Sequence, residues 1–295
     1  MKATYFRLGS SALLLALAAA CSPLGQRTAP APTSTAQSDV TATRDANLAL
    51  GNPSGATADA TNYPNNYLLA KSQYTMSYSR DQGKPNWVSW HLSSAWLGST
   101  ARQDNFAADA TLPSGWYRPG STSYSGSGFD RGHNCPSADR TGSVADNSAT
   151  FLMSNMMPQA PTNNQQTWAN LENYCRTLVS AGNELYIIAG SYGRGGTGTN
   201  GAASTIDGGR VTVPSNCWKV VVVLPVGTSD ASRITSSTRV IAINTPNTNS
   251  ISTSWGSYRT TVDAIENATG YNLLSAVSST VQSSIESKVD TGPTN

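Results

Sequence analysis

Large and small side chains alternate in two nearby segments of the chain, Tyr74–Tyr78 and Trp87–Leu92. A period of two residues is typical of a strand with one buried face, and turn-forming residues lie between the two segments at Asp81–Asn86. Two further segments, Leu185–Ala189 and Trp218–Pro225, are short apolar runs rich in Ile or Val. Such runs are typical of strands that are buried on both faces. The pattern therefore predicts a sheet with two central, fully buried strands.

A helical period replaces this alternation in Gln166–Ser180. We expect two more helices, Tyr258–Thr269 ending at Gly270 and Val277–Val289, and a mobile glycine-rich loop at Arg194–Ala203. Together the elements predict an α+β domain with a largely antiparallel central sheet flanked by helices. The apolar side of the first helix would consist of Trp168, Leu171, Tyr174, Cys175 and Leu178.

The first twenty residues have the pattern of a signal peptide, residues 1–20. A basic start with Lys2 and Arg7 is followed by an apolar run, Leu13–Ala20, that is too short to span a bilayer. The run Ala-Ala-Ala-Cys resembles a bacterial lipoprotein box, in which Cys21 would be lipidated and would attach the protein to a membrane. Ala18 stands where that box usually has Leu, so simple secretion stays open. Either route predicts export from a bacterial cell, as a secreted or a lipid-anchored protein.

Residues 21–62 consist mainly of Ala, Thr, Pro, Ser and Asn, with almost no large apolar side chains. This composition is typical of a disordered tether. Aromatic residues begin at Tyr63 and continue from there, so we expect one folded domain over residues 63–291.

The charge of the chain limits how it could bind a polyanion. It has 19 basic and 17 acidic residues, and loss of Lys2 and Arg7 with the signal leaves 17 of each. A broad basic face for nucleic acid would leave the chain more basic than this. Contacts with an anion must therefore be local.

The charge that exists is concentrated in one stretch, F-D-R-G-H-N-C-P-S-A-D-R at Phe129–Arg140, although only 12% of the chain is charged. His133 in this stretch is one of two histidines, and imidazole is the side chain best suited to proton transfer near neutral pH. Gly132 before it permits close backbone approach. The other histidine, His91, lies between Trp90 and Leu92 in a predicted strand, and we expect it to be structural.

A second polar stretch starts at Ser154 and ends at Glu172. Asn164 precedes the predicted helix, and Glu172 follows eight residues later near the same face. An amide oxygen beside a carboxylate can hold a hard divalent cation. Taken individually, Asn155, Asn163 and Asn164 fit turn and cap positions better than a functional role, and only the pairing with His133 favours Asn164 as a ligand.

These two stretches closely resemble the DNA/RNA non-specific endonucleases, the Serratia-type enzymes with a ββα-metal active site. The resemblance rests on D-R-G-H, then N-M-M-P-Q, then N-Q-Q-T-W-A-N-L-E, in this order, and extends more weakly over most of residues 65–290. It implies the ββα-metal nuclease fold and an endonuclease that acts on DNA and RNA with Mg²⁺, for which Mn²⁺ can substitute. The products would carry 5′-phosphate ends.

The resemblance also implies a role for each matching residue. His133 would be the general base that takes a proton from the attacking water. Asn164 would be the direct protein ligand of the Mg²⁺ ion, and Glu172 would hold the water shell of that ion. Arg102 would neutralise the phosphate in the transition state.

Arg131 and Asn155 would help to position the phosphate and the site. Cys135 lies two residues after His133, and Cys175 lies in the helix that carries Glu172, so a disulfide Cys135–Cys175 would tie the two halves of the site together. Free buried thiols are the alternative. The sequence leaves the oligomeric state open.

Other functions fit less well. Two histidines 42 residues apart do not provide a zinc site, and no G-x-S-x-G elbow marks a serine hydrolase. Two alternatives to the nuclease stay open: a surface nucleic-acid-binding protein that kept the fold and lost the chemistry, and a phosphodiesterase acting on other substrates.

Overall fold

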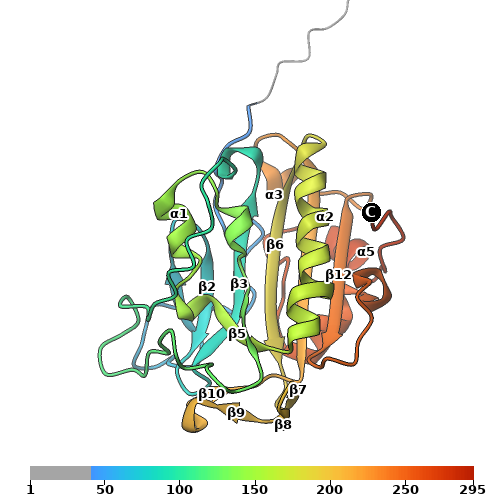
Figure 1. The fold of residues 1–295 in the computed structure, drawn as a ribbon. Coiled ribbons are helices and arrows are strands. Elements are labelled where there is room, and N and C mark those ends of the chain that lie inside the picture. The colour runs from blue at the N-terminus through green and yellow to red at the C-terminus, as the bar shows by residue number, and fades with distance from the viewer. Residues whose placement is uncertain (1–40) are drawn as a thin grey trace, which may run out of the picture. The chain divides into compact units, whose positions relative to one another are not determined.

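The computed structural model describes residues 41–295, and across this range seven strands form one antiparallel sheet in the order β1-β2-β3-β6-β11-β12-β13. The two long central strands, β6 and β11, contain the apolar runs of the sequence and pair over their whole length. The predicted α+β architecture with an antiparallel sheet is confirmed (Figure 1). The strands of this sheet are β1 (Tyr67–Ala70), β2 (Thr75–Ser79), β3 (Lys84–Leu92), β6 (Asn183–Tyr192), β11 (Asn216–Pro225), β12 (Arg239–Pro246) and β13 (Arg259–Thr260).

Helices cover both faces of the sheet, with α2 on one face and α5 on the other (Figure 1). Three two-stranded pairs complete the fold. The helices are α1 (Val144–Ala149), α2 (Ala169–Ser180), α3 (Asp230–Arg233), α4 (Val262–Thr269) and α5 (Ser279–Ile285). The pairs are β4 (Asp130–His133) with β5 (Met156–Gln159), β7 (Gly196–Gly198) with β8 (Gly201–Ala203), and β9 (Thr205–Ile206) with β10 (Val211–Thr212). Single 3₁₀ turns lie at Ser94–Trp96, Ser137–Asp139, Met153–Asn155, Asp207–Gly209 and Trp255–Tyr258.

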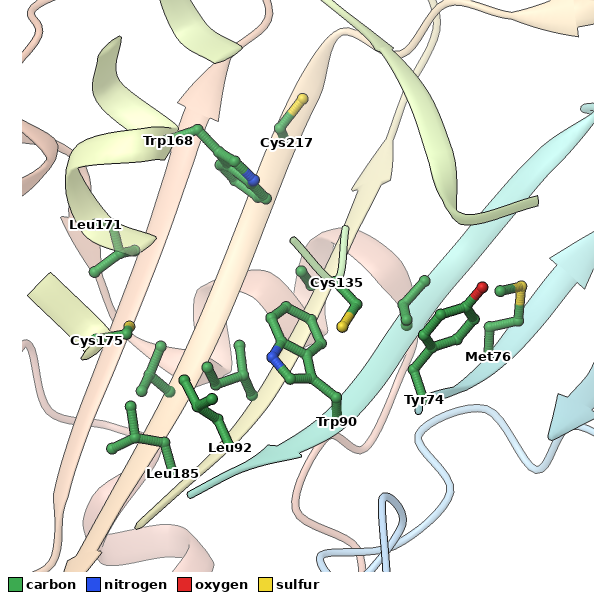
Figure 2. Packing of buried hydrophobic residues seen from close by; sticks show 14 of the residues in the cluster. Tyr74, Met76, Trp90, Leu92, Cys135, Trp168, Leu171, Cys175, Leu185 and Cys217 are labelled. Atoms are coloured by element: carbon green, nitrogen blue, oxygen red, sulfur yellow. The ribbon is translucent and has the colours of Figure 1, made fainter. Parts of the chain in front are cut away.

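Each face of the sheet packs a separate apolar cluster, because successive side chains of a strand point to opposite faces. On β3, Trp90 and Leu92 join the cluster under α2, whereas Trp87 joins the cluster under α4 and α5. Figure 2 shows the first cluster. Trp168, the residue before the start of α2, lies near Cys217 of β11. The same alternation places His91 on the face away from α2.

The predicted disulfide between Cys135 and Cys175 is wrong. All three cysteines among residues 41–295 are free and buried. Figure 2 shows Cys135 beside Trp90 and Cys175 near Leu171, well separated within the apolar cluster. Burial raises the pKa of each thiol to about 12, so the cysteines pack as small neutral side chains.

The folded unit begins earlier than the composition predicts. Leu50 is only 3% exposed and belongs to the cluster under α4 and α5. Asn47 accepts a hydrogen bond from the backbone N–H of His91, and Ser54 Oγ accepts one from Trp87 Nε1 at 2.8 Å. Small polar residues therefore bind this segment to β3 by hydrogen bonds, which a count of apolar residues does not detect. The described part of the predicted tether, residues 41–62, is thus not disordered.

The last two predicted helices are shorter than expected: α4 covers Val262–Thr269, and α5 covers Ser279–Ile285 within the predicted Val277–Val289. Arg259 and Thr260 pair with β12 as β13, so α4 starts only at Val262, where Thr261 caps it through a bond from the N–H of Ala264. Gly270 ends this helix in the left-handed conformation, as predicted. The glycine-rich loop contains the β7–β8 pair.

The predicted signal peptide, Cys21 and the first part of the predicted tether lie outside the described residues. Within residues 41–295, no helix combines the length and the apolar character needed to cross a bilayer.

Candidate active site

The strand pair β4–β5 and the helix α2 form a ββα unit on one face of the sheet. His133 ends β4 opposite Met156, and its backbone carbonyl accepts a hydrogen bond from Trp168 Nε1 at 3.2 Å. Gly132 is required by the packing, because a Cβ there would collide with the side chain of Gln159 on β5. A π-helical turn, Asn163–Trp168, leads into α2. The histidine is therefore held between a strand partner and the start of a helix.

The His133 ring is enclosed by aromatic side chains. Phe106 and Phe151 lie edge-on to it, with ring centroids at 5.7 and 5.1 Å. Burial, and then the positive charges of Arg102 and Arg131, lower the pKa of His133 to about 3. The imidazole is therefore neutral at physiological pH. Its Nε2 atom is buried and has no hydrogen-bond partner among the described residues, so it is free to bind a water or a ligand.

Two arginines hold their guanidinium groups over the rings that enclose His133. Arg102 stacks on Phe151 at 4.8 Å and donates to Asp104 and Ser137, whereas Arg131 stacks on Phe106 at 3.7 Å. Within residues 41–295, the Nη2 atom of neither arginine has a hydrogen-bond partner. Both groups can therefore donate to an anion, such as a phosphate.

Asn164 lies in the first turn of the π-helix and is fixed by Asp130 of β4. Its Nδ2 atom donates to Asp130 Oδ2 at 2.8 Å, and Gln165 donates to the same oxygen. This leaves the amide oxygen Oδ1 of Asn164 free to accept or to coordinate. Both residues line a cavity of about 380 Å³ together with Arg102, Arg131 and Phe106.

Glu172 lies in the first turn of α2, eight residues after Asn164, and does not line this cavity. Its Oε1 atom accepts from the buried Lys219 Nζ at 3.1 Å, and this ammonium also lies 4.2 Å from the ring centre of Trp168. Burial raises the pKa of Glu172, and the charge of Lys219 opposes the shift. The role of Glu172 in the water shell of a metal stays a prediction, because this carboxylate faces Lys219.

Asn155 is buried and does not reach the cavity. Its Oδ1 atom accepts from the N–H of Cys135 at 3.1 Å, and its Nδ2 atom donates to the carbonyls of Cys135 and Thr150. That Asn155 helps to position the phosphate and the site stays a prediction, and its side chain makes no direct contact with the cavity. The side chain supports the site from a distance, by holding the backbone that follows His133.

The structure thus brings Arg102, Arg131 and Asn164 to one cavity. His133 does not line this cavity and lies behind Phe106, which does. Sequence reasoning missed Asp130 and Lys219. Asp130 stood inside the D-R-G-H motif, and Lys219 was a single charge in an apolar run, W-K-V-V-V-V, which was a detectable signal of a buried ion pair.

A second group of possible metal ligands, Asp45, His91 and Glu184, lies elsewhere. The Nδ1 atom of His91 accepts from the N–H of Asp45 at 3.2 Å, so its ring proton lies on Nε2, 3.2 Å from Glu184 Oε2. Arg233 also binds Glu184. Because both ring nitrogens are already engaged, this group is a hydrogen-bonded structural cluster.

A strand pair ending in a histidine, followed by a helix that presents an oxygen ligand beside two arginines, defines the ββα-metal class of phosphodiester hydrolases. A sequence model of the DNA/RNA non-specific endonuclease family matches residues 52–280, and the chain belongs to this family. It is therefore a nuclease that hydrolyses phosphodiester bonds.

Individual relatives agree with this assignment. A nuclease of Nostoc sp. is 50% identical over 284 residues, which cover 96% of this chain and 98% of the relative. The human mitochondrial endonuclease G is 30% identical over 54% of this chain and 56% of its own length. A solved structure of EndoG in complex with EndoGI is similar with a TM-score of 0.62, at 22% identity over 79% of this chain and 91% of that one, and shows the shared fold.

Proposed function

We propose that this chain is an exported endonuclease that cleaves DNA and RNA with Mg²⁺, or Mn²⁺ in its place, and leaves 5′-phosphate ends. One observation carries the proposal: two guanidinium groups and a fixed amide oxygen meet in one cavity, and the neutral His133 lies directly behind Phe106 in its wall.

The residues present fit a hard divalent cation. Asp130 holds the Asn164 amide so that its oxygen is the atom left for a ligand, and amide oxygens suit Mg²⁺. A bound Mg²⁺ supplies positive charge that stabilises the phosphate and the leaving oxygen in the transition state. Asn164 would hold the ion through Oδ1.

The other residues act on the phosphate and the water. Arg102 and Arg131 bind the phosphate oxygens and orient the phosphorus for attack. His133 takes a proton from water as its oxygen bonds to phosphorus, and the bond from phosphorus to the 3′ oxygen breaks. That oxygen gains a proton from solvent, which leaves a 3′-hydroxyl and a 5′-phosphate. The phosphate charge offsets the two guanidinium groups, so the pKa of His133 rises towards a useful range when substrate binds.

The same contacts support indifference to sequence and sugar. Guanidinium groups and a metal recognise the phosphate backbone, which DNA and RNA share, and such contacts carry no base information. The low net charge of the chain also supports local contacts with phosphate, as opposed to binding through a broad basic surface.

A digest of plasmid DNA and of RNA, run side by side with Mg²⁺, tests the function. We expect both to be cut by the wild-type chain, neither to be cut in EDTA, and end-labelling to show 5′-phosphates. Full activity in chelator would refute the metal requirement. Cleavage of DNA alone would refute the absence of sugar selection.

Export through residues 1–20, followed by either secretion or lipidation at Cys21, is part of the proposal. We expect the protein in the envelope or medium fraction of a bacterial host. Detergent-phase partitioning that is lost in Cys21→Ser supports the anchor, and partitioning unchanged by this substitution contradicts it.

A further inference from the structure

Three carboxylates meet on the face of the domain away from α2. Asp263 and Glu266 lie on α4, and Glu286 directly follows α5, which covers this face (Figure 1). One oxygen from each of the three lies within 4.8 Å of the others. The N–H of Asp263 donates to the carbonyl of Glu286 at 3.1 Å, so the backbone fixes the approach of the two helices.

This trio differs from the other carboxylates of residues 41–295, because no basic side chain pairs with any of its members. Buried acids elsewhere in this range each have such a partner; examples are Asp109 with Lys71, Asp139 with Arg176, Glu172 with Lys219, Glu184 with Arg233, and Asp290 with Arg239. Three other acids in the described range lack a cationic partner. Asp59 and Asp45 are partly exposed, and the only basic neighbour of Asp45 is the neutral His91 at 3.9 Å. Asp130 is at the proposed catalytic metal site. The trio therefore lacks the positive charge that the other buried acids of residues 41–295 have.

The missing positive charge matters most at Glu286. Its side chain is only 5% exposed, and its Oε1 atom is buried without a hydrogen-bond partner among the described residues. Burial, and then the charges of Glu266 and Asp263, raise its pKa to about 7. Glu266 also has a raised pKa, mainly from burial, although the N–H of Leu273 donates to its Oε1 atom at 2.7 Å. A buried, unpartnered carboxylate directed at two others is a costly arrangement unless a cation joins it.

We propose that Asp263, Glu266 and Glu286 bind a Ca²⁺ ion that joins α4 to α5. Oxygen ligands lie 2.3–2.6 Å from Ca²⁺, so two ligands of one ion are at most about 5 Å apart, and the three oxygens here lie within 4.8 Å of one another. Mg²⁺ holds its ligands at about 2.1 Å and requires a tighter octahedron. The ion stabilises the carboxy-terminal part of the domain and does not depend on the nuclease activity.

Thermal unfolding of the full chain at pH 8, above the pKa of about 7 of Glu286, tests the site. The Asn164→Ala background is used, so that Ca²⁺ does not bind at the proposed catalytic ligand. At a Ca²⁺ concentration about 100-fold above its Kd, we expect Tm to rise by about 5–10 °C over the value in EDTA. Isothermal titration should give one Ca²⁺ bound per chain.

Glu286→Gln in the same background should abolish both the Ca²⁺-dependent shift and the bound ion. In EDTA this variant should fold and be at least as stable as its parent, because it removes one of three like charges. Asp81→Asn, which removes an exposed carboxylate beside Arg80, is the matched control and should keep the full shift. No shift in the parent, or an equal shift in Glu286→Gln, overturns the proposal and leaves the trio to share a proton.

Discussion

Asn164 Nδ2 donates a hydrogen bond to Asp130 Oδ2 at 2.8 Å, and this contact joins the first strand of the ββα unit to its helix. Gln165 donates to the same oxygen and so restrains the carboxylate. The amide of Asn164 can therefore present only its oxygen to the cavity. Asp130 touches neither the phosphate nor the water in the proposed mechanism, so it is a positioning residue.

Asp130→Ala should raise the Mg²⁺ concentration needed for half-maximal cleavage by about 10- to 100-fold, because the Asn164 amide is then free to rotate. Asn164→Ala should remove nearly all activity. A Mg²⁺ titration of plasmid cleavage measures both effects. Asp81→Asn, which removes an exposed acid elsewhere, should leave the titration unchanged; an unchanged titration in Asp130→Ala as well would show that the contact has no positioning role.

Substitution of the two histidines should have different effects on activity and on stability. His133→Ala should lower kcat by about 10²- to 10⁴-fold without a large change in Tm, since the ring makes few polar contacts. His91→Ala should lower Tm, because it leaves Glu184 without one of its buried partners, yet keep most activity in the folded protein. Paired measurements of kcat and Tm check this. Comparable cleavage by wild type and His133→Ala would exclude a general-base role.

The pH dependence of kcat/KM reports the base in the free enzyme. His133 must be neutral to act, and its pKa of about 3 keeps it neutral above that value. The acid limb at saturating Mg²⁺ should therefore have a midpoint below 6.5, the ordinary value for His. Arg102→Gln removes one of the charges that lower the pKa and should move the midpoint upwards. A midpoint at or above 6.5 in the wild type would contradict the assignment.

The lowered pKa of His133 also makes the stability of the fold depend on pH. The folded-state pKa of His133 lies below its unfolded value, so the unfolded chain binds the extra proton between about pH 6.5 and 3. The contribution of His133 to stability is therefore complete above pH 6.5 and is lost as the pH falls towards 3.

Lys219→Met should destabilise the fold by about 3–5 kcal/mol, because it leaves the buried Glu172 carboxylate unpaired. The double variant Lys219→Met/Glu172→Gln should recover most of this loss, since it removes both charges. Chemical denaturation of the wild type, both single variants and the double variant forms the cycle. Equal destabilisation in Lys219→Met and the double variant would show that the ion pair is not the cause.

The thiols of Cys135, Cys175 and Cys217 should resist alkylation in the native protein and react fully after unfolding without reductant. Burial raises their pKa values, so little thiolate exists at pH 8. Peptide mass mapping distinguishes each site from Cys21. A peptide pair linked through Cys135 and Cys175 would restore the disulfide prediction.

Local patterns predicted the local elements well. The helix that contains Leu171 and the two central strands of Ile and Val follow from periodicity and apolar runs, and the structure places them as expected. The pattern failed where a segment binds through polar contacts, as Asn47 and Ser54 do, or where a strand replaces the first turn of a helix, as at Arg259.

By itself, the sequence determined the elements, the family and the identity of the candidate residues His133, Asn164 and Arg102, because period and motif are local properties of the chain. Only the tertiary structure decided that Asp130 orients Asn164, that Lys219 forms an ion pair with Glu172, and that the cysteines form no disulfide. These relationships join residues far apart in sequence. They depend on which faces of strands and helices meet, and a register shift of a single residue would reverse the faces of a strand.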